Sequence, residues 1–504
     1  MNKELTLNDL KNLKKNNNKK IISLCHGAFD LMHMGHIKHL QNAKSESDIL
    51  VVSLTADSYI NKGPGRPVFN EKLRMESISA LQCVDYVYIS HCKTAIESIE
   101  ALKPDFYVKG SDYINPEDDL SGNINKEISA VKKFGGNIKY TNEITFSSSN
   151  LLNQFFSTID ETVKNFLYTF KKKYSLEKIF SSINDLKNMN VLVVGDAIID
   201  EYNFVNPLGQ TGKGNIPSVR FVGKEKYAGG AIAVANHISN FVKKVDVISV
   251  VGKNKQDTQF LKSMKKKNVK LNLFNIFDET LTKSRYVDQD LNRFFEVYIC
   301  DDLMDMEYSK SKKIEKLIND KIRKYDVVVV PDFGNGFIND RIIKILTNNS
   351  KFLAVNTQIN SGNRGYHAIG RYFKADFISL NEPEARLSSH DRSSDIKSIC
   401  RKIVSNITKS NTISITRGKQ GVLSYDKKKK KYFEIPSLAP KVVDRIGAGD
   451  AFLSLSSILM ANKNDIDLST FVGSVAAAID VQIVCNSKSV DKVDLLKFIN
   501  TIYK

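Results

Sequence analysis

Two long stretches of the chain alternate short apolar runs with segments of helical spacing, and this alternation constrains the fold most strongly. In the first stretch, the runs that we predict as strands are Ile21–Cys25, Ile49–Leu54, Tyr86–Ile89 and Phe106–Val108. In the second stretch they are Val191–Val194, Val245–Val251, Val327–Val330, Phe352–Val355, Phe377–Leu380 and Ile413–Thr416. Strands that alternate with helices form parallel sheets covered on both faces. The sequence therefore predicts two α/β domains.

The 504 residues are enough for about two to four domains. We expect a basic N-terminal segment (1–20), a first α/β domain (21–155), a helical connector (156–186) and a larger α/β domain (187–504). The connector is predicted because its apolar residues follow helical spacing among many lysines, without a strand signal. No repeat of fixed period is visible, which argues against a solenoid.

Composition excludes several classes of protein. With 42% hydrophobic and 26% charged residues, the chain can fold around sizeable cores. No apolar run approaches the roughly 18 residues that cross a bilayer, and the polar start resembles no signal peptide, so we expect a cytoplasmic protein without a membrane partner. The six cysteines are scattered without a CxxC pair, which argues against a disulfide framework and a zinc site.

The net charge of +18 has two interpretations. One is nucleic-acid binding. The other, which we favour, is a solvated basic surface around sites for anionic nucleotides and sugar phosphates, with no nucleic-acid partner. The longest run of lysines, Lys427–Lys431, lies between two strand-like segments and is typical of a hairpin turn. We also expect a homo-oligomer.

A cluster of histidines follows the first predicted strand. These four of the eight histidines are His26, His33, His36 and His39. His33 and His36 flank the entrance to a predicted helix that begins at Gly35, where a nucleotide can approach the backbone and the helix N-terminus favours phosphate. An imidazole there can donate to a phosphate oxygen as charge develops. A lone HxxH is weak evidence, and we expect His26 and His39 to be structural or surface residues.

Several blocks between about Ile21 and Phe155 occur in the order found in one family. They are GAFDLMHMGH, SLTADSYINKGPGRPVFNEKLRM, ALQCVDYVYI, PDFYVKGSDY and SSSN. This part of the chain resembles the HxGH nucleotidyltransferases, which include cytidylyltransferases and the transferase half of bacterial ADP-heptose synthesis proteins. The resemblance implies a Rossmann-like domain that transfers a nucleotidyl group to a sugar phosphate.

The resemblance also implies roles for individual residues. His33, His36 and Lys62 would stabilise the transition state. The residues implied in nucleotide or phosphate binding are Phe29, Asp30, Gly35, Arg74, Ser147 and Ser148. Positioned cations help because the attack on the α-phosphorus gathers negative charge. Taken alone, Lys62 and Arg74 would be ordinary surface cations.

One departure concerns the nucleotide. Many cytidylyltransferases carry an arginine in an RTEG segment before the serines, whereas this chain has Asn142 and Glu143 in TNEITFSSS. The departure weakens CTP as the nucleotide and favours the heptose-type branch, which uses ATP.

A second candidate site lies in the segment VVDRIGAGDAFLSLSSILM. Gly447 and Gly449 permit a tight turn, and the apolar residues from Ala451 onward predict a helix behind it, which makes an anion hole. Asp450 is placed to accept a proton from an attacking hydroxyl while the amides of Gly447, Ala448 and Gly449 hold the phosphoryl group. Alternatively, Asp450 only stabilises the helix N-terminus.

This stretch and the blocks VLVVGDAIIDEY, YAGGAIAVANHIS, ISLNEPEARL and ISITRGKQGVLSY resemble the ribokinase-like sugar kinases over about Lys187–Phe498. The resemblance implies that Asp450 is the base. The residues implied in sugar binding are Asp200, Gly229, Gly230 and Asn236. The residues implied along ATP are Thr416, Arg417 and Gly418. Asn381 and Glu384 would organise the shell of magnesium and phosphate, and they also form a capping-box pattern.

The resemblance makes magnesium with ATP, or with another nucleoside triphosphate, the expected cofactor, held by the nucleotide and water without a tight protein site. Two features depart from the heptose kinase pattern: the segment that follows Gly209, and the residue Asn356. The two domains also stand in the reverse of the order found in the bifunctional ADP-heptose synthesis proteins, whose kinase comes first. We predict a bifunctional enzyme that phosphorylates a sugar, heptose 7-phosphate being the best candidate, and transfers AMP to a sugar 1-phosphate. The alternatives are a protein that activates another sugar or polyol with CDP or another nucleotide, and an inactive regulatory or RNA-binding protein.

Overall fold

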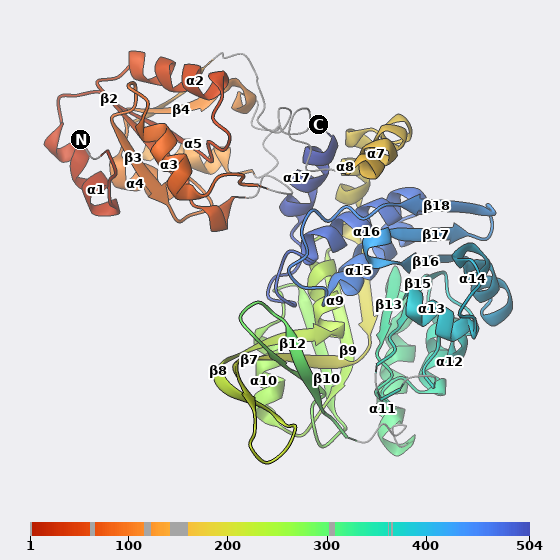
Figure 1. Ribbon diagram of the computed structural model, residues 1–504. Helices are drawn as coiled ribbons and strands as arrows, with labels where there is room; N and C mark the ends of the chain where they lie inside the picture. Colours follow the sequence, from red (N-terminus) through yellow and green to blue (C-terminus); the bar gives the residue numbers. More distant parts are fainter. Residues whose placement is uncertain are drawn as a thin grey trace. The chain divides into compact units, whose positions relative to one another are not determined.

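The computed structural model describes residues 3–60, 66–114, 122–141, 160–301, 308–360, 362–363 and 366–503. The chain forms two compact units, one of Met1–Asp160 with Leu496–Lys504 and the other of Glu161–Leu495 (Figure 1). Two domains of the α/β class were predicted, and this fold class is confirmed. No described helix is long and apolar enough to cross a membrane.

In the described part of the first unit, five parallel strands follow the order β3-β2-β1-β4-β5. The strands are β1 (Ile22–Gly27), β2 (Ile49–Thr55), β3 (Tyr86–Ser90), β4 (Phe106–Gly110) and β5 (Asn137–Thr141). The helices are α1 (Leu7–Asn16), α2 (Met34–Ser45), α3 (Glu71–Ser79), α4 (Ile96–Leu102) and α5 (Ile124–Lys133). Helices α2 and α3 pack on one face of the sheet, and α1, α4 and α5 pack on the other. Strand order reverses between β1 and β4, where open sheets bind ligands.

The second unit is built on a larger sheet with the order β10-β9-β6-β13-β14-β15-β16-β17-β18. The strands are β6 (Asn190–Val194), β9 (Lys244–Val251), β10 (Val269–Asn275), β13 (Val327–Asp332), β14 (Leu353–Thr357), β15 (Phe377–Asn381), β16 (Thr412–Thr416), β17 (Val422–Asp426) and β18 (Lys431–Ile435). They run parallel from β10 to β16, and the hairpin of β17 and β18 closes one edge in antiparallel pairing.

Helices cover both faces of this sheet (Figure 1). The helices of the unit and the C-terminal helix are α7 (Glu161–Lys173), α8 (Leu176–Asn184), α9 (Ala231–Ser239), α10 (Lys255–Ser263), α11 (Tyr308–Lys321), α12 (Asp340–Asn349), α13 (Glu382–Ser389), α14 (Ile396–Lys402), α15 (Ala448–Ala461), α16 (Ile466–Asp480) and α17 (Lys492–Tyr503). Helices α11 to α14 pack on one face. On the other face lies α15, which is buried from Ala451 to Met460 and is therefore apolar around most of its circumference.

A smaller sheet of the second unit has the order β12-β11-β7-β8. Its strands are β7 (Ala197–Gln210), β8 (Pro217–Gly230), β11 (Thr282–Val287) and β12 (Arg293–Ile299). β7 pairs in parallel with β11 and in antiparallel with β8. The first half of β7 is buried and its last residues are exposed, so the sheet reaches outward from the unit.

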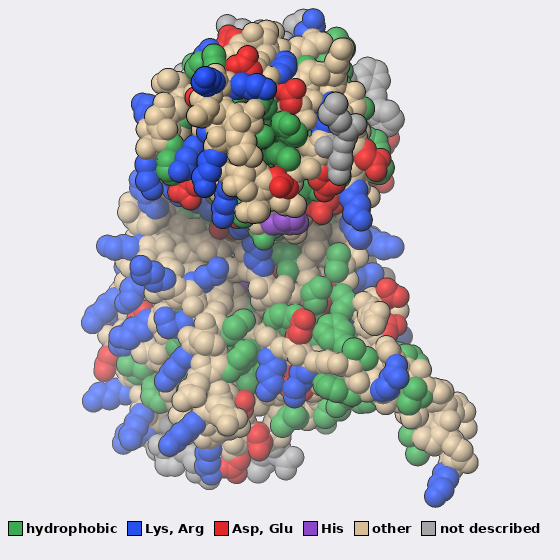
Figure 2. Space-filling model, turned by 90° about the vertical axis from the view of Figure 1, so that its left-hand side faces the viewer, with side chains coloured by type: hydrophobic (Ala, Val, Ile, Leu, Met, Phe, Trp, Pro, Cys, Tyr) green, Lys and Arg blue, Asp and Glu red, His purple; other side chains and the backbone are tan. Residues whose placement is uncertain are grey.

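The predicted strands of the two main sheets are all present. The helix expected after the first strand is α2, and α7 and α8 occupy the segment in which a helical connector was predicted. The lysine run from Lys427 connects β17 to β18, as expected for a hairpin. On the face seen in Figure 2, Lys and Arg side chains are scattered among polar and apolar ones.

Candidate active sites

The first site is centred on the N-terminus of α2. His33 is the N-cap of this helix, and its Nδ1 accepts a hydrogen bond from the backbone N–H of Gly35 at 3.1 Å. The His33 and His36 rings stack with centroids 4.0 Å apart, so the structure brings the two predicted histidines together. Because a helix N-terminus carries positive partial charge, both imidazoles stand where an anion is favoured.

The loop between β1 and α2 is conformationally unusual. Phe29 and Leu31 have φ angles of +46° and +49°, in the left-handed region that few side chains adopt. The Phe29 ring lies edge-on to His36, with centroids 5.5 Å apart, and it is only 6% exposed. Phe29 therefore supports the His36 ring from inside the protein.

Asp30 and Arg74 are used within the protein. Asp30 is 1% exposed, pairs with the buried Arg66 at 3.2 Å, and accepts backbone N–H groups of Val68 and Phe69. Arg74 was expected to bind phosphate or, taken alone, to be a surface cation. Its burial contradicts the surface cation, and the phosphate contact stays a prediction. The side chain is 1% exposed and donates to three backbone carbonyls and to Asp57. Burying a polar group without hydrogen bonds costs free energy, and the partners of Arg74 meet this requirement. Arg74 therefore links the loop to the sheet.

His26 and His39 are held by hydroxyl groups. His26 Nδ1 lies 3.0 Å from Ser53 Oγ, and His39 Nδ1 lies 2.7 Å from Thr141 Oγ1. Burial, together with the nearby charge of Lys109, lowers the pKa of His26 to about 3 and that of His39 to about 4. These neutral, hydrogen-bonded rings agree with the structural roles expected for them.

Four predicted features of this site lie outside the described residues. They are Lys62, Ser147, Ser148 and the departure at Asn142 and Glu143.

The second site is centred on the start of α15. Gly447 is the N-cap with φ +97°, and a Cβ atom there would lie 2.6 Å from Asp480 Oδ2 and 2.8 Å from Asn486 Oδ1. A side chain at Gly449 would meet no atom within 4 Å, so space adjoins the turn on that side. The predicted tight turn and the helix behind it are both present, and the first backbone N–H groups of a helix have no acceptor within it.

Asp450 occupies the first turn of α15 and keeps part of its surface accessible. Burial and the carboxylate of Asp200 raise its pKa to about 7, and the ammonium of Lys283 opposes the shift. A carboxyl group with this pKa can accept a proton near neutral pH. The structure therefore gives Asp450 the properties of a general base.

Asp200 projects from β7 beside Gly229 of β8. A Cβ atom at Gly229 would lie 2.0 Å from Asp200 Oδ2, and one at Gly230 would lie 2.2 Å from a backbone oxygen. Arg285 Nη1 donates to Asp200 Oδ1 at 2.6 Å, and Asn486 Nδ2 donates to Oδ2 at 3.4 Å. Glycines are required here because the two strands approach so closely, and the carboxylate is held in one orientation.

The segment NEPE begins α13. Asn381 and Glu384 form the predicted capping box, in which Glu384 accepts the Asn381 backbone N–H at 2.8 Å and Asn381 accepts that of Glu384 at 2.8 Å. Burial raises the pKa of Glu384 to about 7. Its side chain is 3% exposed, so its contact with a magnesium ion would run through water. Among the described residues, no group of three or more His, Cys, Asp or Glu is placed to hold a metal ion.

The remaining predicted residues of this site are positioned differently. Thr416 ends β16, and Arg417 pairs with Glu382 at 3.3 Å in the loop that follows. A side chain at Gly418, whose φ is +56°, would meet open space. The sugar contact of Asn236 stays a prediction. In the structure its Nδ2 donates to Met264 O and its Oδ1 accepts the Lys266 N–H, both at 3.0 Å. Asn236 therefore secures the end of α10, because both ends of its amide are occupied there.

Lys283 and Arg285 were not predicted as site residues from the sequence. They lie two residues apart on β11, so their side chains face the same side of the sheet. Asp200 faces this side too, because it pairs with Lys283 in the β7–β11 register. The sequence signal for these two residues was the spacing of two between the cations in TKSR, and the strand that contains this segment was not predicted.

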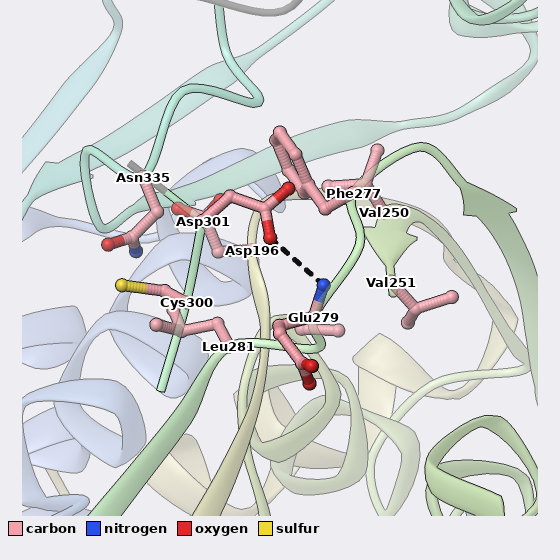
Figure 3. Close-up of a pocket in the computed structure, with 10 residues that line it drawn as sticks. Asp196, Val250, Val251, Phe277, Glu279, Leu281, Cys300, Asp301 and Asn335 are labelled. Carbon is pink, nitrogen blue, oxygen red and sulfur yellow. Dashed lines mark hydrogen bonds between the residues drawn. The ribbon is translucent and has the colours of Figure 1, made fainter. Parts of the chain in front are cut away.

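A small cavity of about 20 Å³ lies near this site, large enough for one water molecule (Figure 3). Its lining includes Asp196, Asn335 and Asp301, and none of the predicted site residues. Asp301 accepts the backbone N–H of Glu279 at 2.9 Å, which Figure 3 marks. Burial raises the pKa of Asp196 to about 7, and the charge of Asp332 contributes. The cavity is too small for a sugar.

This chain matches two protein families. Residues 188–488 match the family described as pfkB family carbohydrate kinase, and residues 24–182 match the family described as cytidylyltransferase-like. The nucleotidyltransferase domain thus precedes the kinase domain. The matches support the enzyme class expected from the sequence, a kinase joined to a nucleotidyltransferase.

Curated relatives match the N-terminal part of the chain. The bifunctional protein HldE of Helicobacter pylori (strain G27) is 44% identical over 117 residues, which are 23% of this chain and 25% of that protein. HldE of Geobacter metallireducens is 38% identical over 149 residues, which are 28% of each protein. The chain therefore spans about a quarter of the length of the curated relatives that it matches.

Solved structures resemble the second unit. Ribokinase from Thermotoga maritima is 15% identical with a TM-score of 0.50, over 62% of this chain and 99% of that one. Phosphofructokinase-2 from Escherichia coli is 14% identical with a TM-score of 0.51, over 63% of this chain and 100% of that one. At these identities the likeness shows the fold alone.

Proposed function

Because the chain belongs to the pfkB family of carbohydrate kinases, we propose that its second unit transfers the terminal phosphoryl group of ATP to a sugar hydroxyl. Asp450 takes the proton of the hydroxyl, the oxygen attacks the γ-phosphorus, and ADP leaves. The amides at the start of α15 hold the transferred group, and Asp200 orients the sugar. A heptose 7-phosphate, phosphorylated at its anomeric hydroxyl, is the substrate we propose first.

The proposed activity of the first unit is nucleotidyl transfer. A phosphate oxygen of a sugar 1-phosphate attacks the α-phosphorus of ATP, and pyrophosphate leaves, which gives an ADP-sugar. His33 and His36 donate to the phosphate oxygens, together with Lys62 and the serines Ser147 and Ser148. The relatives named HldE support this proposal for the first unit. The kinase product would carry two phosphates, so a separate phosphatase would act between the two reactions.

The observation that carries the proposal is the environment of Asp450. A carboxyl group with a pKa of about 7 lies in the first turn of a helix, beside an N-terminal turn with adjoining space and near a carboxylate held for substrate. A helix-capping role alone would favour a solvated carboxylate, whose pKa is not raised by burial.

Magnesium fits this second site only indirectly. The carboxylate of Glu384 accepts two backbone N–H groups, from Asn381 at 2.8 Å and from Ile359 at 3.4 Å. Asn381 and Glu384 would thus orient water molecules around an ion carried by ATP. The ion would neutralise charge on the phosphates.

The test is product analysis by mass spectrometry after incubation with ATP, magnesium and D-glycero-heptose 7-phosphate. A bisphosphate product is expected. A second incubation supplies heptose 1-phosphate with each nucleoside triphosphate in turn, and ATP is expected to give a nucleotide sugar and pyrophosphate. Turnover of a different sugar, or transfer from CTP, would replace the heptose or the ATP assignment.

Failure of all sugars and nucleotides would contradict the proposal as a whole. RNA binding with steep salt dependence, without ATP turnover, would instead identify a regulatory protein that keeps the two folds.

A further inference from the structure

Lys283 has the surroundings of a ligand-binding cation. Its side chain projects from β11, and the residue is 6% exposed. The ammonium makes one hydrogen bond within the described residues, a long one of 3.5 Å to Gln358 Oε1. The rings of Phe333 and Tyr298 lie 5.2 Å and 5.6 Å away. A buried ammonium has three donors to satisfy, so this one is poorly compensated by the protein.

The neighbouring cation is compensated far better. Arg285, two residues along the same strand, pairs with Asp200 and Glu296, both at 2.6 Å. Among the described residues no ion pair joins Lys283 to a carboxylate. The charge of Arg285 is therefore used to hold protein carboxylates, whereas that of Lys283 is left for a group that the protein does not supply.

The position of Lys283 relates this charge to the reacting atoms. The charged groups that act on it are Asp200, Arg285, Glu296 and Asp450. Asp200 is its neighbour in the β7–β11 register, and Gln358 follows β14 in a loop that also donates to Glu384. Lys283 thus lies among the sugar-orienting carboxylate, the base and the capping box at the carboxyl ends of the central strands.

An anionic phosphoryl group entering this region meets several carboxylates. Each of them repels negative charge in a site of low dielectric, where a positioned cation is worth most. Resting on the proposed kinase function, we propose that the Lys283 ammonium donates to the phosphoryl group while it moves between ATP and the sugar hydroxyl. Its hydrogen bonds are thus completed in the transition state and not in the resting protein.

The role proposed for Lys283 predicts a large effect on kcat and a small one on KM. Lys283→Met should lower kcat of the kinase reaction by about 10² to 10³, the loss typical of one donor to a developing anion, with little change in either KM. Lys283→Arg should restore part of the rate. Loss of the ammonium should also raise the pKa of Asp450 and move the acid limb of the kinase pH profile upward. The matched control is Lys270→Met, an exposed lysine on β10.

The deciding measurement is the binding of ADP with fluoroaluminate and magnesium, a planar mimic of the phosphoryl group in transfer. We expect Lys283→Met and Lys283→Gln to bind ADP alone like the wild type, but to lose about 10² in affinity for the fluoroaluminate complex. Two folded variants guard against a local packing effect. Equal affinity for the mimic, or a raised KM for the sugar phosphate with unchanged kcat, would overturn the role of Lys283. Failure of the wild type to bind ADP would overturn the kinase function itself.

Discussion

The two candidate sites are assembled in different ways. In the first unit, His33 and His36 come from one turn of α2 and are three residues apart. In the second unit, Asp200, Lys283 and Asp450 come from β7, β11 and α15, and about 250 residues separate the first from the last. The site of the first unit can therefore be recognised from a local sequence motif, whereas the site of the second unit depends on strand register and tertiary packing.

The difference extends to how charge is handled. His33 and His36 of the first unit lie at a helix N-terminus, where positive partial charge and imidazoles favour phosphate. The second unit buries its base near the carboxylates of Asp200 and Glu384, which raises the pKa of Asp450 to about 7 although the ammonium of Lys283 opposes the shift. The described part of the first site thus offers groups that favour an anion, whereas the second site provides an environment that favours proton removal.

The largest expected effect comes from removing the base. Asp450→Asn should lower the kinase rate by about 10³, because an amide cannot accept the proton of the hydroxyl. The measurement is kcat with sugar phosphate and ATP, and Asp290→Asn, an exposed turn residue, is the control. Retention of most of the rate would mean that Asp450 only stabilises its helix.

A smaller loss is expected in the first site. His36→Ala should reduce pyrophosphate release in the transfer reaction by about 10², since it removes one donor to the developing charge. His33→Ala should also weaken the start of α2, because its side chain accepts the Gly35 N–H. The exposed His91→Ala is the control. A transfer rate in His36→Ala equal to that of the wild type would remove this histidine from the mechanism.

Gly229→Ala tests the packing that the second site needs and the first does not. The added methyl group would lie 2.0 Å from Asp200 Oδ2, so the carboxylate must move. We expect the KM for the sugar to rise about tenfold or more while the KM for ATP stays constant. Gly223→Ala, on the same strand but with open space around it, is the control. An equal rise in both KM values would point to general distortion of the unit.

The last prediction concerns the pH dependence of the kinase reaction. Because Asp450 acts in its ionised form and its pKa is about 7, kinase kcat/KM should fall about tenfold per pH unit below 7 and level off above it. The mechanism proposed for the transfer reaction uses no carboxyl base, so its profile should lack this limb. A kinase profile that is flat down to pH 5 would contradict the environment assigned to Asp450.

The comparison also explains what the sequence could reveal. Buried parallel strands such as Val327–Val330 are continuous apolar runs, and glycines before an apolar helix indicate an anion hole, so these were predicted. Strands β7 and β8 were missed because Pro207, Gly209 and Gly223 interrupt them and their ends are exposed. Lys283 matters only through its pairing with Asp200, which the β7–β11 register creates.

Arg74 shows what the sequence leaves open. Its place in a matched block predicted a phosphate contact, and in the structure it also donates to three backbone carbonyls and to Asp57. A side chain's partners follow from packing, which spacing along the chain does not specify.

The most direct test of two separate sites is an equimolar mixture of the Asp450→Asn and His36→Ala proteins, assayed in turn for sugar phosphorylation and for nucleotidyl transfer. Each reaction is predicted to run at about half the wild-type rate per total chain, because each variant retains one intact site. Absence of either reaction from the mixture, with wild-type protein active in both, would contradict the account.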